Sequence, residues 1–286
     1  MNDAQNANVK WKIENVKYMK KVLFFVMVVL VLTGCNRLVS HNGVQTKEYT
    51  YEEYYALEEG RVDSLYISIA LDFPVKMADQ AVLERVQKSI KRELFGDAYE
   101  EMEIRQAIEA YTAMLKTEYK QNNLPVLAEQ KEESNAELDA IFMEEQIITS
   151  MVMDVHKNIL SYAVERYVFT GGAHGSNYRV FYNFDLSNGE MLHEQDLFKA
   201  DYDAPLTELL LNNMVAQNED FQLIEDLQSY GYNVDEIHPN DNFFLTDSSL
   251  VYVFGQYEIA PYALGETEIA INYDQLRDLL LDPERL

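Results

Sequence analysis

The chain has 286 residues and carries 49 acidic against 23 basic side chains, for a formal net charge of −26. This length supports one large domain or two small ones, with a sizeable hydrophobic core in either case. So acidic a surface repels nucleic acid and anionic lipid head groups and attracts cationic partners, which excludes nucleic-acid binding as a function.

The N-terminus has the pattern of a bacterial export signal. Two lysines precede an unbroken apolar run over 22–32, which is too short to span a bilayer comfortably. The run leads into Leu-Thr-Gly-Cys, which resembles a lipobox, where small residues admit the signal peptidase and the cysteine thiol takes a lipid. We expect a signal peptide over 1–34, a translation start at Met19 and a lipid on Cys35.

A lipid on Cys35 would attach the protein to a membrane of the cell envelope, and to the outer membrane if the organism has two. Cys35 is the only cysteine, so lipidation leaves no thiol for a disulfide, a catalytic thiolate or a metal site. Removing 1–34 lowers the basic total from 23 to 18 and the acidic total from 49 to 47, for a net charge of −29. The polar stretch that follows predicts a tether, which makes 35–60 the lipidated cysteine and its linker. Within it, the aromatic and acidic segment over 49–55 could be an edge strand or an adhesive segment.

The first elements of the folded part are a strand and two helices. Apolar residues on every second position predict a half-buried strand over 62–73 that ends at Pro74. Apolar stripes at helical spacing predict helices over 78–95 and 102–122, with Pro125 closing the second. Each helix has a single apolar stripe, so we expect both on the same side of a sheet.

A run of strands comes next. Apolar and aromatic segments over 147–155, 159–169 and 178–186 are separated by short polar connections. The last of them is followed by an Asn-Gly pair, a strong hairpin signal because both residues tolerate positive φ. These segments predict an antiparallel meander.

The C-terminal third contains both element types again. Helices are expected over 204–215 and 221–230, strands over 243–245 and 250–254 that rejoin the sheet, and a short helix over 273–281. The whole chain therefore predicts an α+β fold, with helices packed on one face of a mostly antiparallel sheet.

Three glycines surround one histidine in the loop over 170–175. Gly171, Gly172 and Gly175 permit unusual backbone angles. A functional interpretation makes His174 a hydrogen-bond donor, a general base or a metal ligand. A structural interpretation, which we favour, makes the loop a tight connection whose imidazole bonds to nearby backbone.

The stretch over 254–271 begins as a strand, breaks at an aromatic-rich loop and resumes with alternating apolar residues. Pro261 fixes its own φ, Gly265 permits positive φ, and Tyr257 and Tyr262 flank the break. A rigid aromatic loop between strands can present a binding surface. The alternative is a plain connection whose tyrosines simply pack.

These two motifs together resemble the signature of a bacterial envelope domain family of unknown function. That family includes the extracytoplasmic, lysozyme-sensing region of the anti-sigma factor RsiV and the N-terminal, non-catalytic region of the deacetylase PdaC. The resemblance implies two consecutive parts, a PdaC-like α+β part over 61–195 and an RsiV-like part over 196–286.

The resemblance further implies an envelope-anchored binding module without enzymatic activity. Its partner would be a cationic protein such as lysozyme, contacted through Tyr257, Glu258, Pro261, Tyr262 and Gly265. The anti-sigma role does not carry over, because an exported lipoprotein cannot hold a sigma factor. Deacetylase activity does not carry over either, because no segment resembles a catalytic domain.

Two other functions stay open. The same loop and the 170–175 turn could bind cell-wall glycan such as peptidoglycan, with tyrosines as stacking surfaces. The protein could also be a hydrolase centred on His174. We assign no catalytic residue, metal or cofactor, because no nucleophile motif occurs and the histidines lack metal-ligand spacing: His41, His156, His174, His193 and His238.

Overall fold

The structure is a computed structural model that describes residues 38–59, 61, 64–133, 142–172 and 174–286. The predicted signal peptide, the start at Met19 and the lipidation site Cys35 lie outside the described residues. Residues 36–286 form one compact unit. No helix in the described part of the chain combines the length and the apolar character that crossing a membrane requires.

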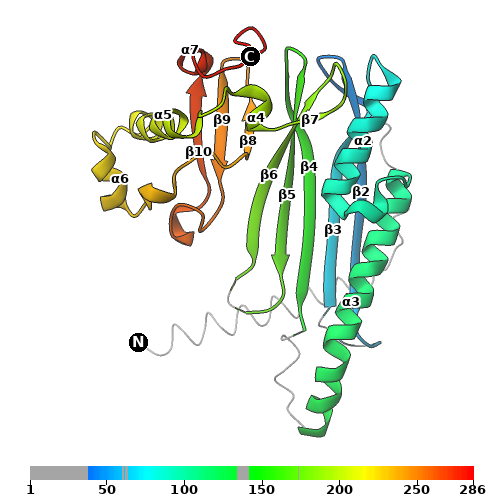
Figure 1. Ribbon diagram of the computed structural model, residues 1–286. Coiled ribbons are helices and arrows are strands. Elements are labelled where there is room, and N and C mark those ends of the chain that lie inside the picture. Colours follow the sequence, from blue (N-terminus) through cyan, green and yellow to red (C-terminus); the bar gives the residue numbers. More distant parts are fainter. Residues whose placement is uncertain (1–37, 60, 62–63, 134–141, 173) are drawn as a thin grey trace. The chain divides into compact units, whose positions relative to one another are not determined.

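Of the two sheets in the described part of the chain, the larger has seven strands, and each strand lies beside its neighbour in the sequence (Figure 1). All pairs are antiparallel except β3 and β4, which are parallel. A parallel pair needs a long crossover, and α2 and α3 supply it. The strands are β1 Leu38–His41, β2 Val44–Ala56, β3 Ser64–Lys76, β4 Glu144–His156, β5 Ile159–Phe169, β6 Ser176–Asp185 and β7 Met191–Leu192.

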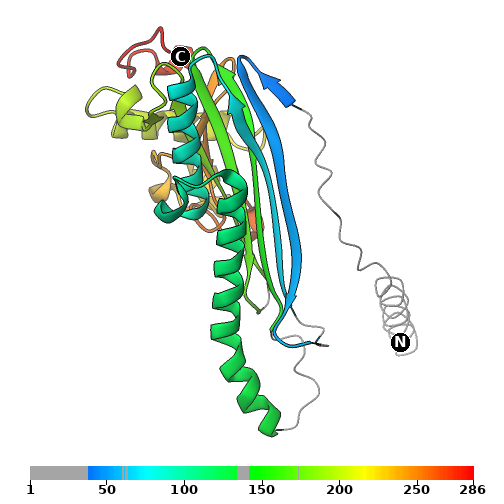
Figure 2. The ribbon, with the colours of Figure 1, turned by 90° about the vertical axis from the view of Figure 1, so that its right-hand side faces the viewer.

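Helices α2 (Gln80–Phe95) and α3 (Ile104–Glu133) cover one face of this sheet (Figure 2). Their apolar stripes pack against alternate residues of β3, β4 and β5 in one hydrophobic core. Asp79 caps α2 by accepting from the backbone N–H groups of Ala81 and Val82. The predicted α+β fold is confirmed.

Two predicted boundaries at prolines are wrong. The first strand continues past Pro74 to Lys76, because Pro74 pairs with β2 beside a register shift at Gln45 and Thr46, where a ladder tolerates a missing donor. The second helix runs through Pro125, which frees only the carbonyl of Gln121 on an exposed turn that water can reach.

The predicted tether is also corrected where the structure describes it. Residues 38–41 and 44–56 form β1 and β2, joined by a tight turn at Asn42 and Gly43, both with positive φ. Alternate residues of β2 face the helices, and Val44 is fully buried. Residues 49–55, for which the sequence left an edge strand as one alternative, belong to β2, and β1 pairs only with 44–47.

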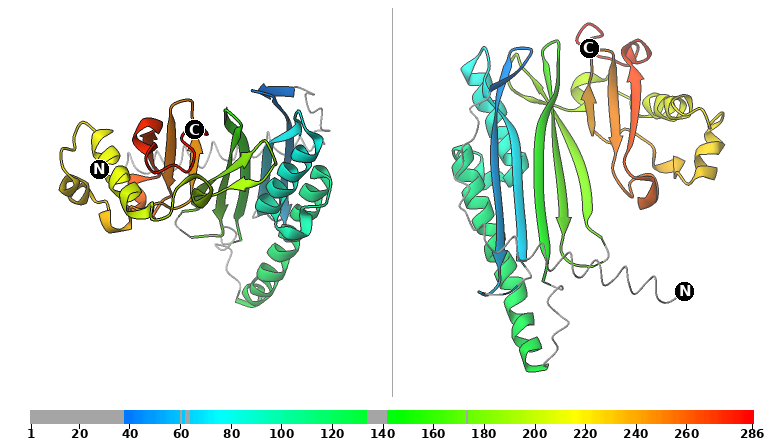
Figure 3. Two further views of the ribbon diagram at one scale, coloured as in Figure 1. Left: turned by 45° about the horizontal axis from the view of Figure 1, so that its top comes forward. Right: turned by 180° about the vertical axis from the view of Figure 1, so that it is seen from behind.

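The second sheet has three strands in the order β10-β9-β8, and it does not continue the first (Figure 3). The expectation that these strands rejoin one sheet is therefore wrong. Helices α5 and α6 and the small sheet share a second hydrophobic core. The elements are α4 Glu194–Leu197, α5 Asp203–Ala216, α6 Ile224–Tyr230, β8 Phe243–Leu245, β9 Ser249–Phe254, β10 Thr267–Asn272 and α7 Tyr273–Leu276.

A buried polar link joins the two sheets. The hydroxyl of Ser161 donates to Oδ1 of Asn183 (2.6 Å) and accepts from the backbone N–H of Leu245 (3.0 Å). Asn183 Nδ2 donates to the carbonyl of Phe243 (2.8 Å). Ser161 is 0% and Asn183 2% exposed, so these bonds lie inside the interface between the sheets. Side chains of β5 and β6 therefore satisfy the N–H of Leu245 and the carbonyl of Phe243 in β8.

We predict that Ser161→Ala lowers the free energy of unfolding by about 1–3 kcal/mol, because the Leu245 N–H stays buried without an acceptor. Denaturant unfolding of the 36–286 unit measures the change. Ser176→Ala is the matched control, since Ser176 is exposed on β6, and it should change stability by less than about 0.5 kcal/mol. Equal effects of the two variants would contradict the assigned role of Ser161.

Candidate functional site

The structure brings the two sequence motifs together. The glycine loop joins β5 to β6, and the loop over 255–266 joins β9 to β10. The ring of His174 stacks on Tyr262, with centroids 4.6 Å apart and planes at 24°. The ring of Tyr257 packs on the ring of Tyr262, with centroids 5.5 Å apart. We call His174, Tyr257 and Tyr262 the aromatic patch.

The aromatic patch is exposed but firmly held. Tyr257 is 64% and Tyr262 36% exposed. Tyr257 has φ of 67°, a left-handed conformation that is unusual for a bulky residue. Between the tyrosines, Ile259 is buried in the second core, and its carbonyl accepts from the N–H of Asn233 (2.8 Å). The loop therefore presents two rings on a fixed backbone.

The other predicted partner-binding residues shape this loop. Glu258 accepts from the N–H of Gly255 (2.7 Å) and from Nδ2 of Asn240 (2.8 Å), so its carboxylate braces the loop. Pro261 begins the 3-10 turn Tyr262–Leu264, and Gly265 ends it with φ of 74°. That positive φ explains the glycine.

The glycine loop has structural reasons for its composition. Gly171 and Gly172 have φ of 91° and 98°. A Cβ at Gly175 would lie 2.5 Å from the ring of Tyr167. His174 Nδ1 lies 3.0 Å from the carbonyl of Gly175, as the structural interpretation of this loop expects. The loop thus sets His174 against Tyr262.

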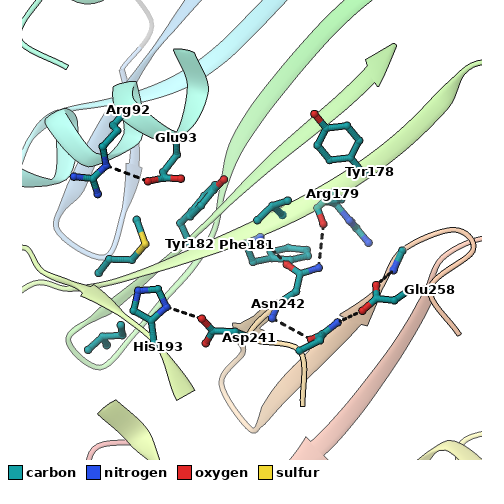
Figure 4. Close-up of a pocket in the computed structure, with 15 residues that line it drawn as sticks. Arg92, Glu93, Tyr178, Arg179, Phe181, Tyr182, His193, Asp241, Asn242 and Glu258 are labelled. Carbon is teal, nitrogen blue, oxygen red and sulfur yellow. Dashed lines mark hydrogen bonds and ion pairs between the residues drawn. The ribbon is translucent and has the colours of Figure 1, made fainter. Parts of the chain in front are cut away.

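A groove of about 570 Å³ lies along the edge of β6, next to Gly255 and Glu258 of the β9–β10 loop (Figure 4). Five consecutive β6 residues form one side of it, and the segment before β8 forms another. The end of α2 and the residues around β7 complete it. The lining residues are Arg92, Glu93, Tyr178, Arg179, Val180, Phe181, Tyr182, Met191, Leu192, His193, Asn240, Asp241, Asn242, Gly255 and Glu258.

The groove contains an Asp–His pair that sequence reasoning missed. His193 Nδ1 lies 2.5 Å from Oδ2 of Asp241, and Oδ1 of Asp241 accepts from the N–H of Glu194 (2.8 Å). Asp241 has φ of 57°, and its N–H donates to the buried carboxylate of Glu194 (2.7 Å). Tyr202 donates to the same carboxylate (2.8 Å). Forty-eight residues separate the paired side chains, so no local motif could signal them.

The remaining histidines do not gather into a metal site. No group of three or more potential metal ligands occurs within the residues that the structure describes. His156, predicted at a hairpin tip, is the last residue of β4 and is buried with its ring 5.1 Å from that of Tyr273. Its Nε2 has no hydrogen-bond partner among the residues that the structure describes. His41, predicted in the tether, lies 3.6 Å from Asp72.

Burial, followed by the charge of Lys157, lowers the pKa of His156 below its ordinary value of 6.5. The unfolded chain then binds a proton near pH 6.5 that the folded chain binds only at lower pH, so folding loses stability as pH falls through this window. We predict that His156→Asn reduces the loss of unfolding free energy between about pH 7.5 and about pH 5. Identical pH profiles for variant and wild type would contradict this assignment.

We predict that Gly175→Ala destabilises the fold by about 1–3 kcal/mol through its clash with Tyr167, and that Tyr167→Ala relieves most of this cost in the double variant. Gly172→Ala is the contrast, because space around Gly172 is open and its cost comes from a φ of 98°. Tyr167→Ala should leave that cost unchanged. Thermal unfolding of the single and double variants measures both cycles.

Comparison with known proteins supports the resemblance. The family described as "Deacetylase PdaC" matches residues 61–177, and the family described as "Protein of unknown function (DUF3298)" matches residues 195–274. The peptidoglycan-N-acetylmuramic acid deacetylase PdaC of Bacillus subtilis is 29% identical over 126 residues. That match covers 43% of this chain and 27% of the relative, so the chain spans about a quarter of PdaC.

Two solved structures share the fold. A DUF3298 family member from Bacteroides fragilis has a TM-score of 0.79 at 27% identity, covering 86% of this chain and 97% of its own. A DUF3298 family protein from Pseudomonas aeruginosa has a TM-score of 0.58 at 17% identity, covering 84% and 95%. The chain is therefore similar to these proteins in fold, with a match to the PdaC model over 61–177 followed by a match to the DUF3298 model over 195–274.

Proposed function

We propose that this protein is a non-enzymatic binding module of the cell envelope, anchored by a lipid on Cys35, whose aromatic patch binds a cationic protein of the lysozyme type. The observation that carries the proposal is the contact between the two motifs, in which His174 of the glycine loop stacks on Tyr262. Two separate loops thus form one exposed surface.

The composition of the patch supports a protein partner. Tyrosine and other aromatic residues dominate the energetic centres of interfaces, because they offer a large apolar face with a polar edge. The backbone around Tyr257 and Tyr262 is held by buried Ile259 and by the Glu258 carboxylate, so little conformational freedom would be lost on binding.

The charge around the patch favours a cationic partner. Glu266 follows Tyr262 in the same connection and Glu268 lies in β10, and Arg179 pairs with both. Two carboxylates on one guanidinium leave a net negative charge where this connection enters β10. This local excess adds to the −26 of the whole chain, which speeds encounter with cations at low salt.

A cell-wall glycan is the second candidate ligand for the same patch, because tyrosine rings also serve as stacking surfaces. Ionic strength separates the two candidates. An encounter driven by charge weakens at high salt, whereas stacking of a neutral sugar on tyrosine persists.

The test is calorimetric titration of the 36–286 unit with a c-type lysozyme at low and high salt. We expect saturable binding that weakens with salt, and a loss of about tenfold or more in affinity for Tyr262→Ala. Tyr54→Ala is the matched control, because Tyr54 is 68% exposed on β2 and outside the patch. Absence of binding at both salt concentrations, or equal weakening by the two variants, would rule out the proposal.

A further inference from the structure

Most charged side chains that line the groove beside β6 already have partners. Asp241 uses one oxygen for His193 and the other for a backbone N–H, and both oxygens of Glu258 accept bonds within the fold. Arg179 pairs with two glutamates of the β9–β10 connection and β10. The amide of Asn242 bonds to the edge of β6, at Phe181 N–H and the Arg179 carbonyl. The polar atoms of these side chains hold the groove together and are not available to a ligand.

The polar atoms left to a ligand include both donors and acceptors. Arg92 and Glu93 share a single bond, from Nε to Oε1 (3.2 Å), which leaves the terminal guanidinium nitrogens and the second carboxylate oxygen. Among the described residues, the hydroxyls of Tyr178 and Tyr182 have no hydrogen-bond partner. A tyrosine hydroxyl is protonated at neutral pH and can donate, and burial, followed by the charge of Glu93, raises the pKa of Tyr182 further, to about 12.

His193 adds an oriented ring. Its Nδ1 lies 2.5 Å from Oδ2 of Asp241, and the tautomer with the proton on Nδ1 donates to this carboxylate and leaves Nε2 as an acceptor. The pair is held by Glu194, which is 6% exposed and bonds to both the backbone and the side chain of Asp241 through its own carboxylate and N–H. Such a supporting set of buried bonds fixes the direction in which His193 points.

The rest of the lining is apolar or aromatic. Phe181 is 3% exposed, while Tyr178 is 45% exposed. Val180, Met191 and Leu192 complete the apolar part. A volume of about 570 Å³ with an apolar lining and a few convergent polar atoms is typical of a small-molecule site.

We propose that this groove binds a neutral saccharide of one or two sugar rings. Each sugar hydroxyl both donates and accepts, which matches the mixture offered by Arg92, Glu93 and His193, and the apolar face of a sugar ring suits the exposed ring of Tyr178. The adjacent Arg92 and Glu93 carry no net charge together. The carboxylates of Asp241 and Glu258 already accept hydrogen bonds within the fold, and an anion would meet the negative field of the chain.

The site is distinct from the aromatic patch, and the inference does not rest on the proposed protein partner. The lining shares Glu258 with the loop that carries the patch, but it includes none of His174, Tyr257 and Tyr262. A variant of Tyr262 should therefore leave the groove intact, and a variant of Tyr178 should leave the patch intact.

The experiment titrates the purified full-length chain with three disaccharides of one size, observed by saturation-transfer NMR and calorimetry. They are neutral N,N′-diacetylchitobiose, cationic chitobiose and an anionic disaccharide of uronic acid. We expect saturable binding of the neutral sugar, weakened about tenfold or more by His193→Ala and by Tyr178→Ala. Tyr54→Ala and Tyr262→Ala should bind it as wild type does.

Three results would overturn the inference: no saturable binding of the neutral disaccharide, tighter binding of a charged one, or binding unaffected by both groove variants. Circular dichroism of each variant separates misfolding from loss of the site. Exposed Tyr178 provides a second variant if His193→Ala fails to fold. Loss of lysozyme binding in Tyr262→Ala with retained sugar binding would show that the two sites are independent.

Discussion

The buried bonds of Ser161 and Asn183 are the constraint on which the rest of the structure depends. They satisfy backbone groups of Phe243 and Leu245 inside the contact between the two sheets, where no water can do so. Beside them, Phe181 stacks on Phe244 with centroids 4.8 Å apart. Apolar packing alone would tolerate several registers, but these bonds specify one position of β8 against β5 and β6.

That register decides where the functional surfaces form. With β8 fixed, the segment before it lies along the edge of β6, so Asn242 can bond to Phe181 and Arg179 and Asp241 can meet His193. The connection from β9 to β10 then reaches the glycine loop after β5, and Tyr262 meets His174. The groove and the aromatic patch are thus products of one contact between two sheets.

Local pattern predicted much of the fold, and its limits have physical causes. The hairpin of β4 and β5, helix α2 and its stop at Gly96 follow from periodicity and glycine chemistry. Proline was wrongly taken as the end of an element in two places. Pro125 costs little stability on an exposed helix face, and Pro74 lies at an irregularity of the β2–β3 ladder. Strand patterns also cannot tell which sheet a strand joins, and β8 and β9 proved to belong to a second one.

The two candidate sites differ in how much of each could be predicted from the sequence. The aromatic loop and the glycine loop were visible as motifs, because each concentrates unusual residues in a few positions. The groove was not, because its residues come from α2, β6, β7 and the segment before β8, and each is ordinary in its own context. The groove residues differ from one another in their hydrogen-bond partners. Both carboxylate oxygens of Glu258 and of Asp241 accept bonds within the fold. Among the described residues, Arg92, Glu93 and His193 each keep at least one polar atom without a partner. In so acidic a chain, the net charge determines how fast partners of each sign approach. The polar atoms without a partner in the fold determine which ligand groups a site can bind.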